Sequence, residues 1–374
     1  MKAFQPHYDV IVVGAGAMGT ATAWKVASAG ATVLLVDQSR IGNTRGSSHG
    51  ESRIYRQAYF EHPDYVPLLK EAWDDWRAMQ GIFNVVGALY VGPENSELIT
   101  GSRFAASQFD LPLGPLHFDD PRGKVIEAPL DWASLFEPTG AVINPERATR
   151  WMADAAQRAG ADIAEDTKVL AWVSDVRGTS IETDQGSYSC DKLVFCGGPW
   201  TAKLIEGLPV ELVVTRQTAH WFVAPLEELD RLAQMPVFGI QDERGTFVYG
   251  FPADRETGLF KIANHTKGVT WDANMESRAS RPDDDVTVRP ALTRFFGGDD
   301  WQVAKISVCL YTNTPDGHFL FDRVPETENA YFIGGTSGHG FKFAPVLGAA
   351  MADVVLTGTT ARPIGFLSLA RFGR

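Results

Sequence analysis

Three short apolar runs each end in a cluster of glycines, and they lie near the beginning, the middle and the end of the chain. They occur in "VIVVGAGAMG", "KLVFCGGPW" and "AYFIGGTSGHGFKF". A short continuous apolar run is typical of a parallel strand buried on both faces. Strand-like sequence punctuated by proline and glycine fills the stretches between them. The pattern predicts an α/β protein, with a discontinuous doubly wound domain over 1–84, 141–212 and 320–374 and a β-rich domain over 85–140 and 213–319.

Helix signals are clearest in "NPERATRWMADAAQRAG", where Asn144 suits an N-cap, Pro145 the first helical position and Gly160 the residue past the end. An earlier helix is expected to place four apolar side chains on one side: Leu68, Leu69, Ala72 and Trp76. Three short alternating strands are expected near 168–174, 179–183 and 186–190, followed by a separate apolar strand in "KLVFCGG".

The first glycine cluster has G-x-G-x-x-G spacing. Gly14 permits the tight turn, Gly16 lets the backbone approach a pyrophosphate, and Gly19 lets the helix pack closely on the strand. The helix is expected to run to about Ser28. Asp37 ends the second strand, 18 positions after Gly19, where an acidic residue suits a ribose hydroxyl pair. The motif predicts an ADP-containing dinucleotide; a tight turn without ligand is the alternative, and the spacing does not separate NAD from FAD.

Composition narrows the class of protein. The 374 residues suffice for two to three domains at roughly 150 residues per domain. The formal net charge of −12 argues against nucleic acid and an acidic membrane surface, although a few local cations could still bind an anionic substrate. Three scattered cysteines form neither a disulfide scaffold nor a zinc site, which favours a reducing compartment. With no segment near 18 consecutive apolar residues and no signal peptide, the sequence predicts a cytoplasmic protein without membrane contact.

Cys309 lies in "KISVCLYTNTPDGHFLFD", within a predicted strand. Free cysteines commonly pack as small apolar residues, and Cys190 and Cys196 are assigned that role. For Cys309 the alternative is a covalent tether for a cofactor, because a thiolate is a reactive nucleophile.

Several cations also attract attention. Arg53 and Arg56 in "SRIYR" would share a face on a helix but not on a strand, and a solvated basic surface is the simplest explanation for them. Lys261 in "LFKIANH" has apolar neighbours and precedes His265 by four residues, although a lone lysine in a strand usually reaches solvent.

Taken together, five motifs resemble the FAD-dependent amine oxidases of the monomeric sarcosine oxidase and N-methyltryptophan oxidase group, over essentially the whole chain. They are "VIVVGAGAMG", "GSSHGESRIYRQAY", "YGFP" followed by "KIANH", "VCLYTNTPDGHFLFD" and "SGHGFKF". The resemblance implies a Rossmann-like FAD domain with a mixed-sheet substrate domain, as in two-domain flavoproteins of the glutathione-reductase type. It also implies oxidation of a secondary amino acid, with hydride passing from the carbon next to nitrogen to FAD, hydrolysis of the imine, and reduction of O2 to H2O2.

The resemblance assigns roles to individual residues. Arg56 and Lys342 would bind the substrate carboxylate, which suits the planar fork of arginine. Lys261 would lie next to the flavin and activate O2. The substrate pocket would be lined by Tyr249, His265 and Tyr311, none of them an obligatory base, and activity is expected to rise with pH because the amine must be neutral.

On the cofactor side, Cys309 would carry FAD through a thioether to its 8α-methyl group. His49 and Arg53 would lie beside the flavin, although His49 could instead be a structural histidine. The full cofactor-binding set is Cys309, Gly14, Gly16, Ala17, Met18, Gly19, Asp37, Ser47, His49, Arg53, Val169, Gly197, Trp200, Gly338, Gly340 and Lys342.

Two positions depart from the family pattern: Ser48 and Gln57 stand where histidine is common. The substrate therefore stays open among sarcosine, bulkier N-methyl amino acids and cyclic imino acids such as proline or pipecolate. A dehydrogenase of the same fold that passes electrons to a quinone or carrier protein is the second enzyme hypothesis. A catalytically silent FAD-binding subunit would be expected to have lost Lys261 or the carboxylate-binding pair, and both are retained. The resemblance favours a monomer.

Overall fold

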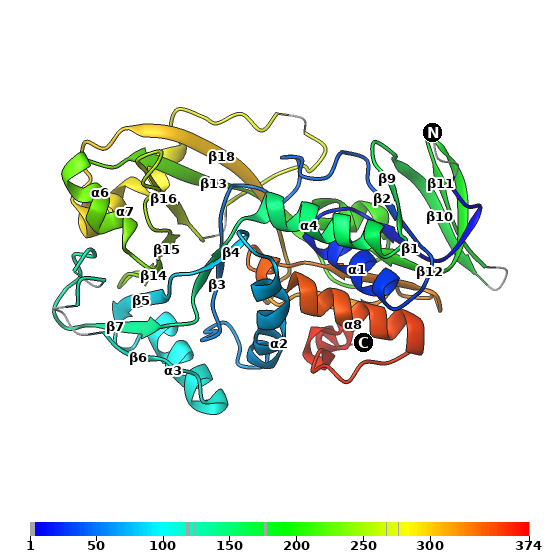
Figure 1. The fold of residues 1–374 in the computed structure, drawn as a ribbon, viewed down its shortest axis with the longest axis horizontal. Helices are drawn as coiled ribbons and strands as arrows, with labels where there is room; N and C mark the ends of the chain where they lie inside the picture. Colours follow the sequence, from blue (N-terminus) through cyan, green and yellow to red (C-terminus); the bar gives the residue numbers. More distant parts are fainter. Residues whose placement is uncertain are drawn as a thin grey trace.

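The computed structural model describes residues 4–116, 120–122, 124–175, 178–266, 268–275 and 277–373. Two large sheets occupy the two ends of an elongated molecule, and helices cover the first of them (Figure 1). A small three-stranded sheet contains β3 (Arg53–Tyr55), β8 (Ala141–Ile143) and β4 (Phe83–Val85).

The first sheet is built on parallel strands, as the apolar runs predict. β1 (His7–Val13) lies between β2 (Val33–Val36) and β12 (Gly186–Phe195), and all three run parallel. The sheet is completed by β9 (Asp162–Ala164), β10 (Val169–Asp175), β11 (Gly178–Thr183), β19 (Leu320–Arg323) and β20 (Ala330–Gly334). The strands expected at 186–190 and in "KLVFCGG" are a single strand. Its polar first half pairs with β11, and its apolar second half enters the parallel sheet between β1 and β20.

Helices α1 (Ala17–Ser28), α4 (Pro145–Arg158) and α8 (Ala344–Thr357) pack together beside this sheet, and α2 (Tyr65–Ala78) packs on α8 (Figure 1). The Asn144 side chain caps α4 by accepting the N–H of Arg147 at 2.9 Å, which confirms the predicted helix start. The four apolar side chains expected on one side of α2 are all buried.

The second sheet is mixed, because β14 (Val237–Gln241) runs parallel to β5 (Ala88–Pro93) and its other pairs are antiparallel. Its remaining strands are β6 (Gly114–Pro115), β7 (Trp132–Glu137), β13 (Val213–Val223), β15 (Phe247–Gly250), β16 (Leu259–Asn264), β17 (Val269–Thr270) and β18 (Val303–Asn313). Three α-helices lie between strands of this sheet along the chain: α3 (Glu97–Phe109), α6 (Leu226–Ala233) and α7 (Arg289–Phe296). The exact domain boundaries stay a prediction.

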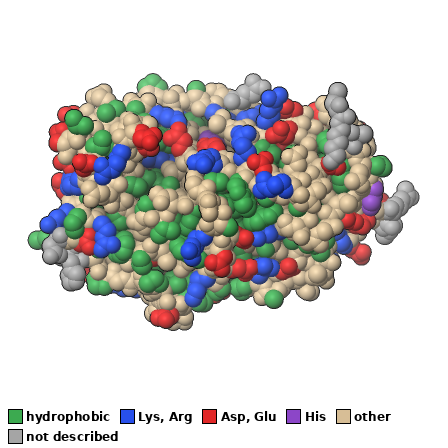
Figure 2. Space-filling view, in the orientation of Figure 1, with side chains coloured by type: hydrophobic (Ala, Val, Ile, Leu, Met, Phe, Trp, Pro, Cys, Tyr) green, Lys and Arg blue, Asp and Glu red, His purple; other side chains and the backbone are tan. Residues whose placement is uncertain are grey.

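Short helical turns complete the chain: η1 (Gly198–Trp200), α5 (Thr201–Leu204), η2 (Asp284–Thr287), η3 (Phe341–Phe343), η4 (Gly365–Leu367) and η5 (Leu369–Phe372). Within the described residues, no helix is long and apolar enough to cross a membrane. Figure 2 shows acidic and basic side chains interspersed over one face, with apolar side chains between them.

Candidate active site

The turn after β1 is built by glycines in close contact. Gly14 has φ +104°, and a Cβ there would lie 2.4 Å from the carbonyl oxygen of Cys196. A Cβ on Gly19 would lie 1.7 Å from the carbonyl oxygen of Gly14. Both positions therefore require glycine, and the turn that they form lines a cavity, where the backbone can approach a pyrophosphate closely.

Asp37 follows β2 and reaches back to the glycine turn. Its carboxylate accepts the N–H of Ala15 at 2.6 Å and that of Ser39 at 2.8 Å. Burial raises the pKa of Asp37, while the two amides oppose that rise. The acid lies beside the turn, where a ribose hydroxyl pair could bind it.

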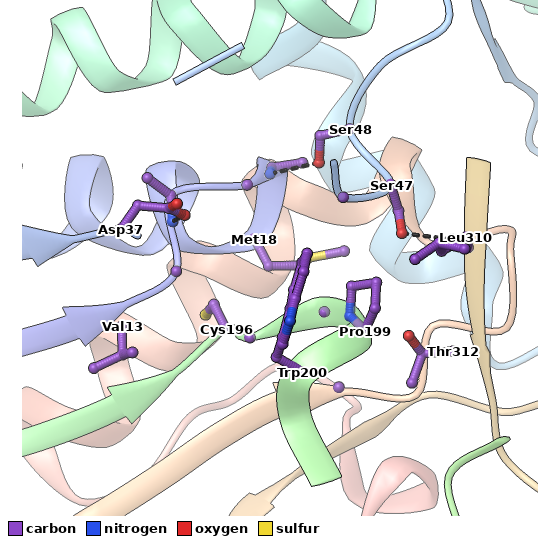
Figure 3. Close-up of a pocket in the computed structure, with 18 of the residues that line it drawn as sticks. Val13, Met18, Asp37, Ser47, Ser48, Cys196, Pro199, Trp200, Leu310 and Thr312 are labelled. Atoms are coloured by element: carbon purple, nitrogen blue, oxygen red, sulfur yellow. Dashed lines mark hydrogen bonds between the residues drawn. The ribbon is translucent and has the colours of Figure 1, made fainter. Parts of the chain in front are cut away.

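A first cavity of about 310 Å³ opens at this turn. In Figure 3, Met18 and Asp37 reach it from the β1–α1 side, Ser47 and Ser48 from the loop before β3, and Pro199 and Trp200 from the segment after β12. Twelve of the predicted cofactor residues line it: Gly14, Gly16, Ala17, Met18, Asp37, Ser47, Arg53, Val169, Gly197, Trp200, Gly338 and Gly340. The glycine turn beside Asp37 in this lining fits the pyrophosphate and ribose of FAD. Gly19 lies behind the wall, packed on Gly14.

A second cavity of about 90 Å³ adjoins the first, and the two share Arg53, Tyr311, Gly338 and Phe341. It is lined by the other predicted cofactor residues, His49, Cys309 and Lys342. Four predicted substrate residues also line it: Arg56, Tyr249, His265 and Tyr311. The Nε2 atom of His49 is buried without a hydrogen-bond partner, as expected beside a site that receives a polar ligand.

Arg56 lines the second cavity and follows directly after β3, which ends at Tyr55. Its Nη2 atom lies 2.5 and 2.7 Å from the two carboxylate oxygens of Glu61, a residue that sequence reasoning missed. Burial raises the pKa of Glu61, but the charges of Arg56, His339 and Lys342 and the hydrogen bond from Arg56 together outweigh it and lower that pKa to about 2. Arg56 is buried, so the alternative of a solvated basic surface is wrong for this residue.

Lys342 lies in η3, buried, with Nζ donating to the carbonyl oxygen of His339 at 2.8 Å. Burial and the nearby charge of Arg56 lower its pKa to about 7. Arg56 and Lys342 therefore meet in a cavity that Arg53 also lines and that has one internal carboxylate among its described lining residues, Glu61. This arrangement leaves positive charge available for an anionic ligand.

Tyr249, His265 and Tyr311 form one aromatic group. Nδ1 of His265 lies 3.3 Å from the Tyr311 hydroxyl, and burial lowers the pKa of His265 to about 4, so its ring is neutral at neutral pH. Gly338 makes room for the Tyr311 ring, since a Cβ there would lie 2.2 Å from a ring carbon. These three side chains give the cavity an uncharged aromatic wall, whereas Arg56 and Lys342 bring positive charge to it.

Cys309 lies in β18, opposite Gln217 of β13. Its Sγ atom is 3.6 Å from Nη2 of Arg53. Burial raises the pKa of the Cys309 thiol, but a hydrogen bond from His49 and the charges of His49 and Arg53 outweigh it and lower the pKa to about 7. In contrast, burial raises the pKa of Cys190 and of Cys196 to about 12. Cys309 is thus the thiol with substantial thiolate character at neutral pH.

Lys261 is buried in β16. Its Nζ atom lies 2.6 Å from the carbonyl oxygen of Gly50, and 3.1 and 2.9 Å from the carbonyl and hydroxyl oxygens of Ser52. Burial and the charge of Arg53 lower its pKa well below the ordinary value, whereas three oxygen acceptors suit the three donors of an ammonium. Gly50 is one of the described residues that line the second cavity, whereas Lys261 is not among the described lining residues of either cavity.

The two departures from the family pattern both have structural partners. Ser48 Oγ accepts the N–H of Ala17 at 3.0 Å, at the first turn of α1, and Gln57 donates to the Tyr55 hydroxyl at 3.0 Å. Sequence reasoning missed Glu137, a fully buried carboxylate that accepts the backbone N–H groups of Gln57 at 2.7 Å and Ala58 at 3.0 Å. It thereby anchors the backbone that follows Arg56. No local sequence signal marks such a long-range contact.

Within the described residues, no group of histidine, cysteine and acidic side chains is placed to hold a metal ion. The site therefore consists of a glycine-lined cavity joined to a small cavity with two buried cations, a reactive thiol and an aromatic wall.

Comparison with known proteins agrees with this geometry. Residues 9–354 match the family described as FAD dependent oxidoreductase. Monomeric sarcosine oxidase from Streptomyces avermitilis is 33% identical over 380 residues, covering 98% of each chain. N-methyl-L-tryptophan oxidase from Yersinia pestis is 33% identical over 378 residues, covering 98% of this chain and 99% of the other.

Solved structures share the fold. NikD, an unusual amino acid oxidase essential for nikkomycin biosynthesis, superposes with a TM-score of 0.82 at 23% identity over 97% of this chain and 98% of NikD. L-proline dehydrogenase from P. horikoshii gives a TM-score of 0.83 at 18% identity over 99% and 98% of the two chains. The α/β flavoprotein fold and the resemblance drawn from the motifs are confirmed, and the chain belongs to the FAD dependent oxidoreductase family.

Proposed function

We propose that the protein is a flavin-dependent oxidase of N-methyl amino acids, of the kind named by its sarcosine and N-methyl-L-tryptophan oxidase relatives. The observation that carries the proposal is the convergence of Arg56 and Lys342 in a small cavity that adjoins the glycine-lined cavity. Two buried cations next to one internal carboxylate suit a substrate that brings a second carboxylate.

FAD would be held by the glycine turn, Asp37, Ser47 and Trp200 along the first cavity, with Arg53 and His49 at its boundary with the second. When bound, FAD supplies a two-electron acceptor for the hydride that leaves the carbon next to the amine nitrogen. The product imine is then hydrolysed in water.

The chain's own residues bind and prepare the substrate. Arg56 and Lys342 hold the carboxylate, which fixes the amine end toward the wall of Tyr249, His265 and Tyr311. A neutral amine is needed for hydride loss, and the positive charges of the two cations lower the pKa of a bound ammonium. His265 is uncharged at neutral pH and adds no positive charge of its own.

Cys309 is proposed to carry FAD through a thioether to the 8α carbon. Support comes from its lowered pKa, its position beside Arg53, and its place in the second cavity. In forming the bond, the thiol and the methyl group each lose one hydrogen, and O2 takes up both hydrogens as H2O2.

Lys261 is proposed to assist the reduction of O2, because a buried ammonium stabilises the superoxide anion formed first. Support comes from its burial and its three hydrogen bonds to the loop that carries His49. A monomer in the cytoplasm is the proposed state; the relatives named monomeric support the first part of this proposal.

One sample tests the function. The purified yellow protein is mixed anaerobically with sarcosine, N-methyltryptophan, proline and pipecolate in turn, then exposed to air. Bleaching by an N-methyl amino acid, fast recolouring in air and formation of H2O2 are expected. Bleaching without fast recolouring would identify a dehydrogenase, bleaching by proline or pipecolate alone would identify a cyclic imino acid enzyme, and no bleaching by any of the four would contradict the proposal.

A further inference from the structure

Two of the three cations that line the second cavity, Arg56 and Lys342, lie over one aromatic ring, that of Tyr59. Cζ of Arg56 is 4.3 Å from the centroid of this ring, and Nζ of Lys342 is 5.1 Å from it. Tyr59 is fully buried. The face of an aromatic ring carries negative charge density and attracts cations, most strongly where water is excluded. The ring therefore offsets part of the repulsion between two like charges held close together.

The Tyr59 ring is fixed from its hydroxyl end. The hydroxyl bonds to Nδ1 of His339, and Nε2 of the same ring lies 3.0 Å from the carbonyl oxygen of Gly317. A carbonyl only accepts, so Nε2 carries the hydrogen and Nδ1 accepts from Tyr59. The carbonyl oxygen of His339 accepts from Lys342 at 2.8 Å. His339 thus holds the ring and one of the two cations in a single arrangement.

We propose that Tyr59 is a positioning residue whose ring face keeps Arg56 and Lys342 together and charged for the substrate carboxylate. The inference rests on the proposed function, since it assumes that these cations bind a carboxylate. Tyr59 itself lies outside the described residues that line the two cavities, so it acts through Arg56 and Lys342 rather than on the substrate.

Lys342 is the cation of the pair that can lose its charge. Burial and the charges of Arg56 and Arg53 lower its pKa to about 7, although the charge of Glu61 opposes this shift. The charged or titratable groups around it are Arg53, Arg56, Tyr59, Glu61, His265 and His339. The negative charge density of the ring face favours the ammonium form of Lys342. Reducing that charge density should therefore lower the pKa of Lys342.

A series of side chains of similar shape separates the effect of the ring's charge density from the effect of its shape. The flavin-loaded protein is compared in three forms: wild type, Tyr59→Phe, and the Tyr59→Phe variant carrying 3,4,5-trifluorination on that ring. The probe is methoxyacetate, which has the carboxylate of sarcosine but no amine nitrogen to titrate. Its Kd is measured by calorimetry at pH values on both sides of 7.

For the wild type, affinity should fall as pH rises through the pKa of Lys342, because the ammonium is the form that binds an anion. Tyr59→Phe should keep that midpoint. Trifluorination should move it about one pH unit lower, which makes binding roughly tenfold weaker above pH 7 and changes it little at low pH.

Equal midpoints in the Phe and trifluorinated forms, or an equal loss of affinity at every pH, would overturn the inference. Failure of the wild type to bind methoxyacetate at any pH would overturn the proposed carboxylate site and this inference with it. The two failures are distinguishable because the second is already seen without any substitution.

Discussion

Arg53 and Cys309 meet where the two cavities join: Nη2 of Arg53 lies 3.6 Å from Sγ of Cys309, and Arg53 lines both cavities. The two residues come from different sheets, β3 and β18, and are 256 positions apart in the sequence. The contact brings a positive charge to a buried thiol. The charge of Arg53, together with His49, lowers the pKa of the Cys309 thiol to about 7, although burial opposes this, so the thiol loses its proton near neutral pH.

If Cys309 carries the flavin, Cys309→Ala should release it. After acid precipitation, the yellow colour should stay in the pellet for the wild type and move to the supernatant for Cys309→Ala. Cys190→Ala is the matched control, because burial raises the pKa of that thiol to about 12 and it should behave as wild type. Colour in the supernatant of the wild type would refute the covalent bond.

Lys261→Met should slow the reaction of reduced flavin with O2. An ammonium about 4 Å from the new superoxide charge is worth roughly 4 kcal/mol at an effective dielectric near 20, or about a thousandfold in rate. Flavin reduction by substrate under anaerobic conditions should change little. Stopped-flow absorbance measures the two half-reactions separately.

Lys305→Met is the control for Lys261→Met. Lys305 lies 4.9 Å from the Trp221 ring centroid, almost as Lys261 does at 4.8 Å, but it is half exposed and paired with Glu51. It should leave both half-reactions unchanged. Equal losses in reduction and reoxidation for Lys261→Met would show a general disturbance of the site rather than a role in oxygen chemistry.

The pKa of Lys342 predicts a falling limb in the pH profile of kcat/KM. Below about pH 7 the free enzyme carries the ammonium that binds the substrate carboxylate, and above it that charge is lost. The neutral amine of the substrate becomes more abundant as pH rises, so kcat/KM should pass through a maximum. At saturating substrate, kcat should keep rising, because the bound carboxylate keeps Lys342 protonated.

Lys342→Arg tests this assignment, since a guanidinium stays charged throughout the range. The variant should lose the falling limb while retaining the rising one. A falling limb at the same pH in Lys342→Arg would assign that titration to another group.

The parts of this site that sequence alone could predict are those encoded in short segments. The glycine spacing from Gly14 to Gly19 requires close backbone packing, and Asp37 follows directly from the strand after it. Cys309 could be placed on a strand from its neighbours. These features depend on local geometry, which a single segment determines.

What sequence could not predict depends on the tertiary fold. Arg53 lies in β3 and Arg56 follows its end, yet both side chains line the second cavity, which the spacing of the two residues does not predict. Glu137 lies 80 positions from Gln57 yet binds its backbone amide. Glu61 is close in sequence to Arg56, but an exposed acid would look the same in the sequence, and only the fold brings its carboxylate to Nη2 of Arg56.

Glu61→Gln should lower the stability of the protein and raise its affinity for a carboxylate ligand. Removing one partner of a buried ion pair costs about 3 kcal/mol or more, so the melting temperature should fall. A carboxylate that binds Nη2 of Arg56 has to displace Glu61, so methoxyacetate should bind the variant more tightly and raise its melting temperature by more than that of the wild type.

The pH dependence of stability gives this prediction a second test. The pKa of Glu61 is about 2, below its ordinary value, so its ion pair stabilises the folded wild type at neutral pH and is lost as pH falls toward 2. The melting temperatures of wild type and Glu61→Gln should therefore converge in acid. Glu94→Gln is the control, because its ion pair with Arg103 is exposed and should contribute little. A constant difference between wild type and Glu61→Gln down to low pH, or weaker methoxyacetate binding by the variant, would show that Glu61 does not compete for Arg56.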